Sequence, residues 1–561
     1  MAAETWATDF AAPFEVDTLL EVRVSGMNKM PGLNVPTGID KKPVDRPVKV
    51  NKMGLEGDWH DLTFHGGPDK AILGYCSSHY PNWATSYPDR REKFVPGGFG
   101  ENLVTPRMNE RNVCIGDVVS VGPEVQLQVS LPRQPCFKLN HRFSLKNFAP
   151  VTYQTSRTGW YYRVVQEGTV RAGDEIRLVE RRHPRWTIER VQEYLHRDKD
   201  NLEMNRLLAE LEALGEESRG QFRNRVARAT RKKAPRPPGD EWTDYSIIER
   251  RKETPTVISL TLQRVAAAAA LDPDAAAERP RLLGAHARLK LRNGLIRTYS
   301  VVSSSRSRDV LELGIALAQN SRGGSRHLHH DAKVHDTIQV GRLTTDVRPD
   351  SAASNHVFIA SGIGITAFVA LLQRLTSIHW SCELHYAVRS AADVPFADRL
   401  AALPAGVVTL YDKSRGQRMD IPAIVRSMPW NSHIYACGPS RMMQAVRTAV
   451  HDAGIPPSEV HYEAFTAETS GDPFDVEVAH PNGTRLLHVG PDETLLDVLR
   501  RDFPDAPSSC EVGNCGTCKV VVRAGRVHHR GTALSAEEKH SAMLACVSRG
   551  IGQVAISLGT G

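Results

Sequence analysis

The pattern of apolar and polar positions changes several times along the chain. Residues 16–182 alternate short apolar runs, such as VCIGDVVSVG and VQLQVSLP, with Gly and Pro turns, which predicts a small β-barrel or sandwich. Residues 183–228 change to a helical period in three short stretches, which predicts a three-helix appendix. Residues 242–348 return to the pattern of strands and predict a second barrel.

The C-terminal part of the chain has two further patterns. In residues 352–466, apolar strands, glycine turns and helical segments repeat as HVFIASG, CELHYAV and HIYACGP, which indicates a parallel sheet with crossover helices. Residues 474–561 form a compact segment that contains a cysteine cluster. A basic, proline-rich stretch at residues 229–241 predicts a linker. The sequence therefore predicts a multidomain protein that combines the α+β and α/β classes.

Length and composition agree with several soluble domains. The 561 residues exceed what one core holds, and domains of about 100 to 200 residues suggest three to five of them. No stretch approaches the ~20 consecutive apolar residues of a membrane-spanning helix, and the N-terminus has no apolar signal segment. We expect a cytoplasmic protein without a membrane partner.

The net charge of +7 comes largely from the region of residues 219–236, which contains eight Lys or Arg residues and no acid. A nucleic-acid-binding arm is one interpretation of this region. We favour a solvated helix end and interdomain linker, and expect no nucleic acid partner.

Four of the nine cysteines are clustered near the C-terminus. Cys510, Cys515 and Cys518 form a C-x4-C-x2-C loop, and Cys546 follows after 27 intervening residues. This spacing is typical of plant-type [2Fe-2S] clusters, in which three thiolates converge from one loop and a fourth comes from a distant element. Zinc is the alternative, but its sites normally use pairs of C-x2-C. The sequence therefore predicts that these four cysteines bind a [2Fe-2S] cluster.

Two motifs between residues 242 and 348 are candidates for binding a flavin. In IRTYSVVSS, alternate side chains at the end of a strand could line one surface, so Arg297 could pair with a phosphate and Tyr299 could contact the isoalloxazine beside Ser300. A second group, Gly323, Gly324 and Ser325, precedes a helical stretch, where free backbone amides favour a phosphate.

The following domain has candidates for binding a nicotinamide nucleotide. Gly362 and Gly364 end a strand and Thr366 opens a helix, which forms a phosphate turn without the third glycine of the dinucleotide fingerprint. The later strand end ACGP carries Cys437 and Gly438, and HYEAF closes the domain at Phe465. Cys437 is either a small core residue or lies near the nicotinamide, and we favour the second interpretation.

Residues 242–561 resemble the phthalate dioxygenase reductase family in these motifs and in their order. The resemblance implies a flavin barrel, a nicotinamide domain and a β-grasp, plant-type ferredoxin domain. It also implies hydride transfer from nicotinamide to the flavin N5 and single-electron transfer to the cluster. The Gly-Gly-Ser site resembles that of the FMN-using members, so FMN is expected rather than FAD. Arg389 lies where a 2'-phosphate could be bound, which leaves NADPH as the alternative to the expected NADH.

The N-terminal region contains a suggestive cysteine. Cys136 directly follows Pro135 and lies close to Arg133, whose charge would favour a thiolate that acts as a soft metal ligand or nucleophile. A lone cysteine that only fills the core is the alternative. The segments EGD, HGGPDK and FGENL at residues 56–58, 65–70 and 99–103 also stand out.

Residues 16–225 resemble the MOSC domain, in particular the bacterial type with a three-helix appendix that reduces 6-hydroxylaminopurine. The resemblance implies that Cys136 ligates molybdenum in the pterin cofactor and that His65, Asp69 and Lys70 belong to the pocket. It also implies that Cys136, His65 and Asp69 are the catalytic residues. His65 could donate a proton near the metal or be purely structural. The partners implied for the pterin phosphate are Lys41, Lys70 and Arg133, with ordinary surface charge as the alternative.

The two resemblances together imply one function. Electrons would pass from NADH to FMN, to the [2Fe-2S] cluster and to a molybdenum cofactor, and reduce small N-hydroxylated substrates. The first alternative is a reductase that supplies a separate oxygenase, with the MOSC unit as a docking or cofactor-binding module. The second is a carrier of molybdopterin or sulfur without turnover of its own.

Overall fold

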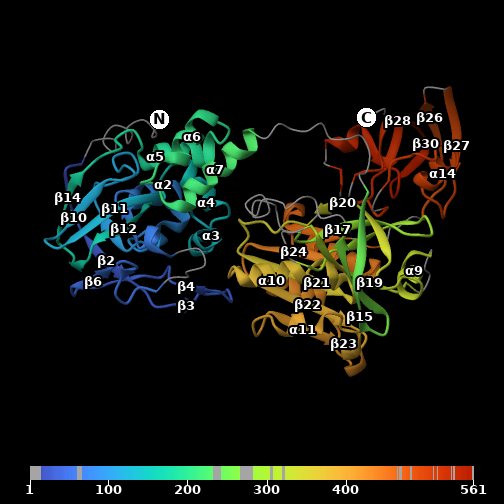
Figure 1. Cartoon of the computed structure of the whole chain (residues 1–561), viewed down its shortest axis with the longest axis horizontal. Helices are drawn as coiled ribbons and strands as arrows, with labels where there is room; N and C mark the ends of the chain where they lie inside the picture. The colour runs from blue at the N-terminus through green and yellow to red at the C-terminus, as the bar shows by residue number, and fades with distance from the viewer. Residues whose placement is uncertain are drawn as a thin grey trace. The chain divides into compact units, whose positions relative to one another are not determined.

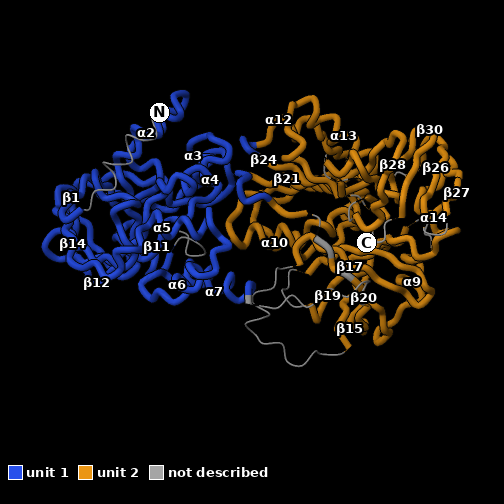
Figure 2. The backbone as a smooth tube through the Cα atoms, turned by 90° about the horizontal axis from the view of Figure 1, so that it is seen from above, with its two compact units in different colours: residues 1–236, 350–354, 429–431 blue, residues 237–349, 355–428, 432–561 orange. Residues whose placement is uncertain are grey.

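The structure is a computed structural model in which most of the chain is placed. The described residues are 14–59, 66–230, 242–265, 282–303, 308–318, 323–345, 347–463, 465, 470–480, 483–508, 511–513, 516–531, 533–534 and 537–558. The chain divides into two compact units (Figure 2): residues 1–236, 350–354 and 429–431 form unit 1, and residues 237–349, 355–428 and 432–561 form unit 2.

Unit 1 is built on a nine-stranded sheet of order β1-β14-β10-β11-β12-β8-β9-β2-β5. Its strands, in chain order, are β1 (Val16–Thr18), β2 (Glu21–Val24), β5 (Lys42–Pro43), β8 (Ile72–Cys76), β9 (Leu103–Thr105), β10 (Val118–Val121), β11 (Val125–Pro132), β12 (Trp160–Gln166) and β14 (Glu175–Glu180). On β11 the alternate residues Val125, Leu127, Val129 and Leu131 are buried, as the apolar alternation of VQLQVSLP predicts.

Smaller strands and short helices complete the unit. The further strands are β3 (Asn28–Lys29), β4 (Pro36–Thr37), β6 (Val48–Asn51), β7 (Gly54–Leu55) and β13 (Gly168–Val170), and the helices before residue 183 are η1 (Pro68–Lys70), α2 (His79–Ser86), η2 (Pro88–Lys93), α3 (Phe137–Phe143) and α4 (Phe148–Gln154).

The predicted helical appendix is present (Figure 1). It consists of α5 (Ile188–Gln192) continued by η3 (Glu193–Arg197), α6 (Leu202–Glu210) and α7 (Glu216–Thr230). The side chains of Thr187 and Asn201 accept hydrogen bonds from the first turns of α5 and α6, which explains where these helices begin. Leu208 and Phe222 are fully buried in the core that the helices share with the large sheet.

Unit 2 begins with a six-stranded antiparallel sheet of order β18-β17-β20-β15-β16-β19. Its elements are β15 (Thr243–Thr254), β16 (Val257–Arg264), β17 (Ala285–Lys290), β18 (Ile296–Ser300), β19 (Val310–Ala316), α9 (Gly324–His330) and β20 (Thr337–Thr345). An antiparallel bridge between Val301 and Leu313 joins the two edges of the sheet, so the sheet curls back on itself around one core.

The next part is a five-stranded parallel sheet of order β23-β22-β21-β24-β25. Its elements are β21 (Asn355–Ser361), η4 (Gly362–Ala367), α10 (Val369–Ser377), β22 (Cys382–Val388), η5 (Ala391–Asp393), α11 (Ala397–Ala401), β23 (Val408–Asp412), η6 (Lys413–Arg415), α12 (Ile421–Ser427), β24 (Ser432–Cys437), α13 (Ser440–Asp452), η7 (Pro457–Glu459) and β25 (Val460–Glu463).

The central strands β21 and β24 of the parallel sheet are buried on both faces, which explains their continuous apolar runs. Phe358 and Ala360 of β21 belong to one core, with α10, whereas Val357 and Ile359 belong to a second core, with α12 and α13. The strand order reverses between β21 and β24, because the chain first builds β22 and β23 on one side and then β24 and β25 on the other. In open parallel sheets such a switch point opens the crevice in which ligands bind.

The C-terminal domain is a mixed five-stranded sheet of order β27-β26-β30-β28-β29 with one main helix. Its elements are β26 (Phe474–His480), β27 (Gly483–Val489), α14 (Leu495–Asp502), β28 (Lys519–His528), η8 (Glu538–His540), β29 (Ala542–Leu544) and β30 (Arg549–Ser557). A capping box between Thr494 and Asp497 starts α14, whose leucines pack into the core of the sheet. This arrangement agrees with the predicted β-grasp domain.

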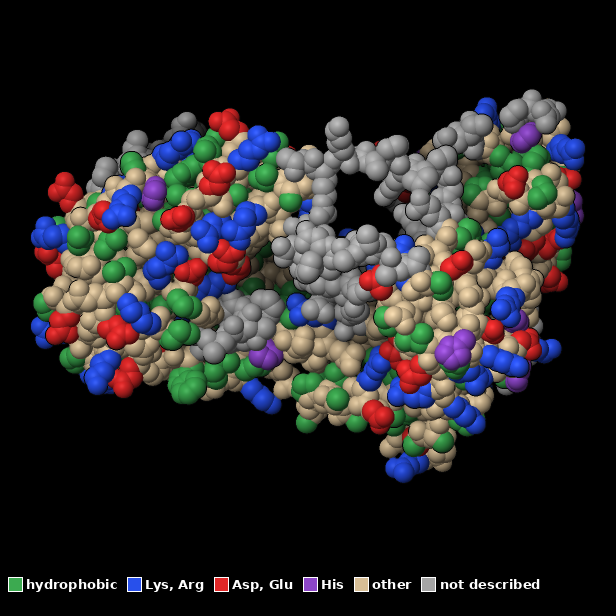
Figure 3. All heavy atoms as spheres, in the orientation of Figure 1, with side chains coloured by type: hydrophobic (Ala, Val, Ile, Leu, Met, Phe, Trp, Pro, Cys, Tyr) green, Lys and Arg blue, Asp and Glu red, His purple; other side chains and the backbone are tan. Residues whose placement is uncertain are grey.

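Two properties of the described residues bear on partners. Within the described ranges, no helix has both the length and the apolar character that a membrane-spanning segment needs. On the face shown in Figure 3, Lys and Arg side chains are interspersed with Asp and Glu side chains over the part of the surface that the structure describes.

Candidate functional site

The thiol of Cys136 lies in a pocket of unit 1. The residue directly precedes α3, with an extended backbone, and its side chain is partly exposed. Because β11 ends at Pro132, the short segment between strand and helix holds Cys136 at a fixed place on a rigid scaffold. The pocket around it is lined by the side chains of Lys41, Lys70, Arg133 and Lys138. The structure thus brings Cys136 together with the three basic residues predicted for this site.

Lys138 was not identified from the sequence, although it lies in the first turn of the helix that follows Cys136. Its Nζ donates to the carbonyl of Pro36 at 3.1 Å, which holds the ammonium group at the pocket. Lys70 pairs with Glu217 of α7, and its Nζ lies 6.0 Å from the centre of the Tyr161 ring. The pocket therefore collects cations from several separate segments.

Lys41 is the most constrained of these cations. It forms an ion pair with Asp58, and their side chains are only 7% and 1% exposed. Burial lowers the pKa of Lys41, while the carboxylates of Asp58 and Glu101 act in the opposite direction. Asp58 also accepts hydrogen bonds from the backbone N–H of Ser25 at 3.0 Å and from the side chain of Asn102 at 2.9 Å. The position of Lys41 is thus fixed by a buried polar network.

Arg133 shows most directly that the pocket suits an anion. The residue is 6% exposed, and its Nη1 has no hydrogen-bond partner among the described residues. Its guanidinium carbon lies 5.8 Å from the centre of the Phe99 ring. A buried charged donor without a partner is costly, so an anionic group in the pocket would satisfy it. Together with a thiol and three lysines, these groups fit an anionic cofactor that takes a sulfur ligand.

Asp69, predicted to be catalytic, is not among the residues that line this pocket. Its Oδ1 accepts from Arg163 Nε at 3.0 Å and Nη2 at 2.7 Å, and its Oδ2 accepts from the backbone N–H of Glu216 at 3.0 Å. In the short η1 turn, Lys70 therefore faces the pocket, whereas the neighbouring Asp69 is hydrogen-bonded to β12 and to the start of α7. The predicted His65 lies outside the described residues.

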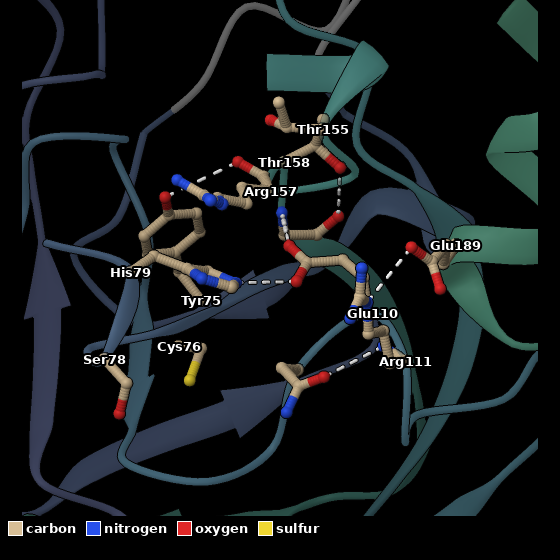
Figure 4. Close-up of polar contacts among 12 residues, drawn as sticks. Tyr75, Cys76, Ser78, His79, Glu110, Arg111, Thr155, Arg157, Thr158 and Glu189 are labelled. Carbon is tan, nitrogen blue, oxygen red and sulfur yellow. Dashed lines mark hydrogen bonds and ion pairs between the residues drawn. The ribbon is translucent and has the colours of Figure 1, made fainter. Parts of the chain in front are cut away.

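Glu110, a buried carboxylate of unit 1, was not predicted from the sequence (Figure 4). Glu110 is 1% exposed; its Oε1 accepts from the backbone N–H of Gly159, and its Oε2 lies 2.7 Å from His79 Nε2. The carbonyl of Gly159 in turn accepts the backbone N–H of Arg133 at 3.0 Å. Glu110 therefore positions the segment that carries Arg133, and nothing in the local sequence around Glu110 indicated this role.

In unit 2, the residues predicted to bind the flavin lie close together. Arg297 and Tyr299 are alternate residues of β18 and are both half-buried. A Cβ atom at Gly324 would lie 2.7 Å from Arg297 Cγ, so the start of α9 packs directly against this arginine. Gly323 has a φ of +92°, which favours glycine and lets the chain turn toward Arg297. The two predicted phosphate-binding elements thus form one site.

Tyr299 and Ser300 have the properties of donors to a ring system. Burial raises the pKa of Tyr299 to about 12, so its phenol remains protonated at neutral pH. Ser300 is 4% exposed, and its Oγ has no hydrogen-bond partner among the described residues. An unpartnered, buried hydroxyl beside the phosphate site fits a flavin whose ring heteroatoms need polar partners.

The residues predicted to bind the nicotinamide nucleotide divide into two groups. Gly362, Gly364, Gly438 and Phe465 line a cleft of about 660 Å³ at the switch point between β21 and β24. A Cβ atom at Gly364 would lie 2.2 Å from the carbonyl oxygen of Cys437, so only glycine permits the two strand ends to approach so closely. This contact creates the floor of the cleft.

The second group, Thr366 and Cys437, does not line the cleft. Thr366 is 1% exposed, and its Oγ1 donates to the carbonyl of Ile363 at 2.8 Å, which completes the η4 turn. Cys437 is fully buried in a hydrophobic core, and this burial raises the pKa of its thiol well above the usual value. The geometry favours a core role for Cys437, the alternative interpretation of the sequence.

Glu463 is a further polar residue beside this cleft that the sequence analysis did not single out. It ends β25, in register with Cys437, and is 1% exposed. Its Oε1 lies 3.2 Å from Nε2 of His286, which comes from the neighbouring antiparallel sheet. The ring of Phe465 lies 6.5 Å from the ring of His286. This buried pair thus joins the flavin and nicotinamide domains next to the cleft.

Two of the four cluster cysteines are described, and they meet. The Sγ atoms of Cys518 and Cys546 lie 3.1 Å apart, and both residues are buried. Cys518 precedes β28 and Cys546 follows β29, so distant segments supply neighbouring thiols. Gly513 has a φ of +83°, and a Cβ atom there would lie 2.7 Å from Val547. Cys510 and Cys515 lie outside the described residues.

Comparison with protein families assigns each part of the chain. Residues 61–177 match the MOSC domain, residues 186–229 the YiiM-like 3-alpha helix domain, residues 343–460 the dimethylamine monooxygenase subunit DmmA-like N-terminal domain, and residues 479–549 the 2Fe-2S iron-sulfur cluster binding domain. The fold and the sites therefore define an electron-transfer reductase, with flavin, nicotinamide and [2Fe-2S] parts joined to a MOSC domain.

Individual relatives place the chain more closely. A reductase of Gibberella moniliformis (strain M3125 / FGSC 7600) is 35% identical over 558 residues, which cover 96% of this chain and 95% of the relative. The phthalate 4,5-dioxygenase oxygenase reductase subunit of Pseudomonas putida is 31% identical over 274 residues, 47% of this chain and 83% of that protein. Protein YiiM of Escherichia coli (strain K12) is 42% identical over 147 residues, 26% of this chain and 65% of that protein.

The chain belongs to the family of the Gibberella reductase, in which a MOSC domain with a YiiM-like three-helix domain is fused to a phthalate dioxygenase reductase-like module. Both resemblances predicted from the sequence are confirmed.

Proposed function

We propose that this chain is a self-sufficient reductase of N-hydroxylated compounds such as 6-hydroxylaminopurine. Electrons from a nicotinamide nucleotide would pass through FMN and the [2Fe-2S] cluster to a molybdenum cofactor in the MOSC pocket. The observation that supports this proposal most strongly is the pocket itself, in which cations surround the partly exposed thiol of Cys136. One of them is the buried Arg133, whose Nη1 has no partner in the part of the chain that the structure describes. This donor set suits an anionic, sulfur-ligated group.

Each residue of the pocket has an assigned role. Cys136 would bind the metal through its sulfur, and Arg133, Lys41 and Lys70 would balance the negative charge of the pterin phosphate. When bound, the cofactor supplies two electrons for cleavage of the N–O bond. The balanced reaction is R-NHOH + NAD(P)H + H⁺ → R-NH2 + H2O + NAD(P)⁺.

For the reductase part, we propose FMN rather than FAD. Arg297 and the amides of Gly323, Gly324 and Ser325 would bind its phosphate, because these groups come together at the start of α9. The side chains of Tyr299 and Ser300 would contact the isoalloxazine. The nicotinamide nucleotide would lie in the cleft that Gly362, Gly364, Gly438 and Phe465 line.

We propose Cys510, Cys515, Cys518 and Cys546 as the cluster ligands. The short distance between the thiols of Cys518 and Cys546 supports the assignment, since two sulfurs this close can share one iron. The cluster accepts electrons from the flavin one at a time.

The test uses the full chain loaded with FMN, iron, sulfide and molybdenum cofactor. We expect 6-hydroxylaminopurine to be converted to adenine at the expense of reduced nicotinamide nucleotide, detected by chromatography. Cys136→Ser should abolish this conversion and the bound molybdenum, but leave reduction of cytochrome c intact. Cys114→Ser is the matched control, because Cys114 is a buried thiol of the same domain that does not line the pocket. Full conversion by Cys136→Ser would refute the assignment.

A second candidate function is the supply of electrons to a separate oxygenase. It is favoured by the similarity to the phthalate 4,5-dioxygenase oxygenase reductase subunit, whose name describes such a role. The two functions differ in their dependence on dilution. In the self-sufficient reductase, turnover per chain stays constant when the protein is diluted, because the tether supplies an effective concentration of roughly millimolar. A supplier needs added oxygenase, and its rate falls on dilution.

A further inference from the structure

One end of the nucleotide cleft carries three cations. Arg389 directly follows β22, Lys413 directly follows β23, and Arg418 lies a few residues further along the chain. All three line the same cleft as the phosphate turn at Gly362 and the strand end at Gly438. In doubly wound sheets the first turn holds the pyrophosphate, and the end of the second strand lies against the adenosine ribose. The three cations therefore lie at the end of the cleft where the adenosine ribose is expected to bind.

The two loops that carry these residues are joined by Asp412, a buried carboxylate at the end of β23. Its Oδ2 accepts the backbone N–H of Ala391 at 3.1 Å, and its Oδ1 accepts the N–H and Oγ of Ser414 at 2.8 and 2.6 Å. The N–H of Ser414 also lies 2.9 Å from the carbonyl oxygen of Arg389. This network holds the loop after β22 beside the loop after β23, so the cations are kept close together.

The charges at this end of the cleft lack internal compensation. The side chains of Arg389, Lys413 and Arg418 form no ion pair or hydrogen bond with any residue that the structure describes. By contrast, Arg415 of the same loop pairs with Asp412, and Arg399 pairs with Glu312. Unpaired cations that share a cleft repel each other, and a bound anion relieves this repulsion.

Among the described residues that line this cleft, the acidic one is Asp393. NAD-specific sites use a carboxylate at the end of the second strand to bind the ribose hydroxyls, and here that position is occupied by Arg389. Asp393 lies four residues further on, and its Oδ2 accepts a hydrogen bond from Ser390 Oγ at 2.9 Å. Among the residues that line this end of the cleft, three are cations and one is a carboxylate that is already hydrogen-bonded. This balance of charge favours a ligand that carries an additional phosphate.

We infer that the preferred electron donor is NADPH, and that Arg389, Lys413 and Arg418 bind its 2'-phosphate. This inference rests on the proposed reductase function, and it replaces the expectation of NADH from the sequence. The guanidinium group of Arg389 makes the main contact, since it can bind a phosphate with two parallel hydrogen bonds. Lys413 and Arg418 add charge.

Binding to the full chain tests the inference without turnover. Isothermal titration compares adenosine 2',5'-bisphosphate, which carries the additional phosphate, with 5'-AMP, which lacks it. We expect the bisphosphate to bind at least about tenfold more tightly, and Arg389→Ala to weaken its binding by about 10- to 100-fold while 5'-AMP binding is unchanged. Lys413→Ala/Arg418→Ala should give a similar loss. Arg426→Ala, which removes an exposed arginine of α12 outside the cleft, should behave like the wild type.

Steady-state rates with ferricyanide as acceptor distinguish the possible failures. A higher kcat/KM for NADPH than for NADH, reversed by Arg389→Ala, supports the inference. A wild-type preference for NADH, or equal values for both, overturns it while the reductase function stands. No oxidation of either nucleotide by the flavin-loaded protein refutes the reductase function itself.

Discussion

Arg133 allows the proposed cofactor pocket to be tested through two effects of opposite sign. The substitution Arg133→Met keeps most of the volume of the side chain and removes its charge and its hydrogen-bond donors. In the protein without cofactor, Nη1 of Arg133 is buried and has no partner among the described residues. Removing it should therefore not destabilise the fold, although it weakens cofactor binding.

The expected magnitudes follow from the contacts of the side chain. Loss of the contact with the Phe99 ring costs about 0.5–1 kcal/mol. Removal of an unsatisfied buried donor stabilises the cofactor-free protein by about 1–3 kcal/mol. We therefore expect the cofactor-free pocket to be unchanged or more stable by up to about 2 kcal/mol. A charge-assisted hydrogen bond to the cofactor contributes about 1.5–3 kcal/mol, so affinity should fall roughly 10- to 150-fold.

Two measurements on the full chain follow these effects separately. Hydrogen exchange of the β11 and β12 amides reports the local free energy of opening, and molybdenum analysis after dialysis reports retention of the cofactor. Arg163→Met is the matched control. Arg163 forms a hydrogen-bonded ion pair with Asp69 outside the pocket. Its loss should therefore lower local stability by about 1 kcal/mol and leave molybdenum binding nearly unchanged. Strong destabilisation by Arg133→Met, or undiminished molybdenum, would refute the interpretation of the pocket.

Three further predictions concern unit 2. Gly364→Ala places a Cβ atom 2.2 Å from the carbonyl oxygen of Cys437 and should cost about 3 kcal/mol or more; an unchanged unfolding midpoint would contradict the close contact. Burial lowers the pKa of His356 to about 3, so this histidine destabilises the fold as the pH falls below its ordinary pKa of 6.5. At pH 4.5 the loss is roughly 3 kcal/mol. His356→Gln should therefore show a shallower decline of thermal stability between pH 6.5 and 4.5, and equal slopes would disprove this. Cys518→Ser and Cys546→Ser should each abolish the visible absorption of the cluster but retain FMN. The control Cys382→Ser should retain both the cluster and FMN. If the cluster persists in Cys518→Ser or Cys546→Ser, the replaced cysteine is not a ligand.

The fold could be predicted wherever one physical pattern was strong. The alternation of VQLQVSLP gave β11 because a half-buried strand needs an apolar residue at every second position. The apolar runs in HVFIASG and HIYACGP indicated central strands of a parallel sheet, because strands buried on both faces show no polar alternation. Thr187 and Asn201 mark the starts of two helices that the change of period also indicated. These features are local, and the sequence states them directly.

The site was predicted where chemistry is local and missed where it depends on distant contacts. Cys136 and Arg133 stand three residues apart, so their proximity needed no tertiary information. Glu110 acts on Arg133 only through Gly159, which is 49 residues away along the chain. The clustering of Arg389 with Lys413 likewise depends on the pairing of β22 with β23, and no spacing in the sequence states it.

The direction of a side chain is the part of a site that sequence patterns leave most open. Asp69 and Lys70 are neighbours in one motif, yet the η1 turn sends Lys70 into the pocket and Asp69 to Arg163. In the same way, Gly438 lines the nucleotide cleft, whereas the preceding Cys437, the last residue of β24, is buried in a core. In short turns and at strand ends, a shift of one residue separates a ligand-binding group from a scaffold group. A family motif therefore identifies the segment of a site, and the packing of that segment decides which of its side chains reach the ligand.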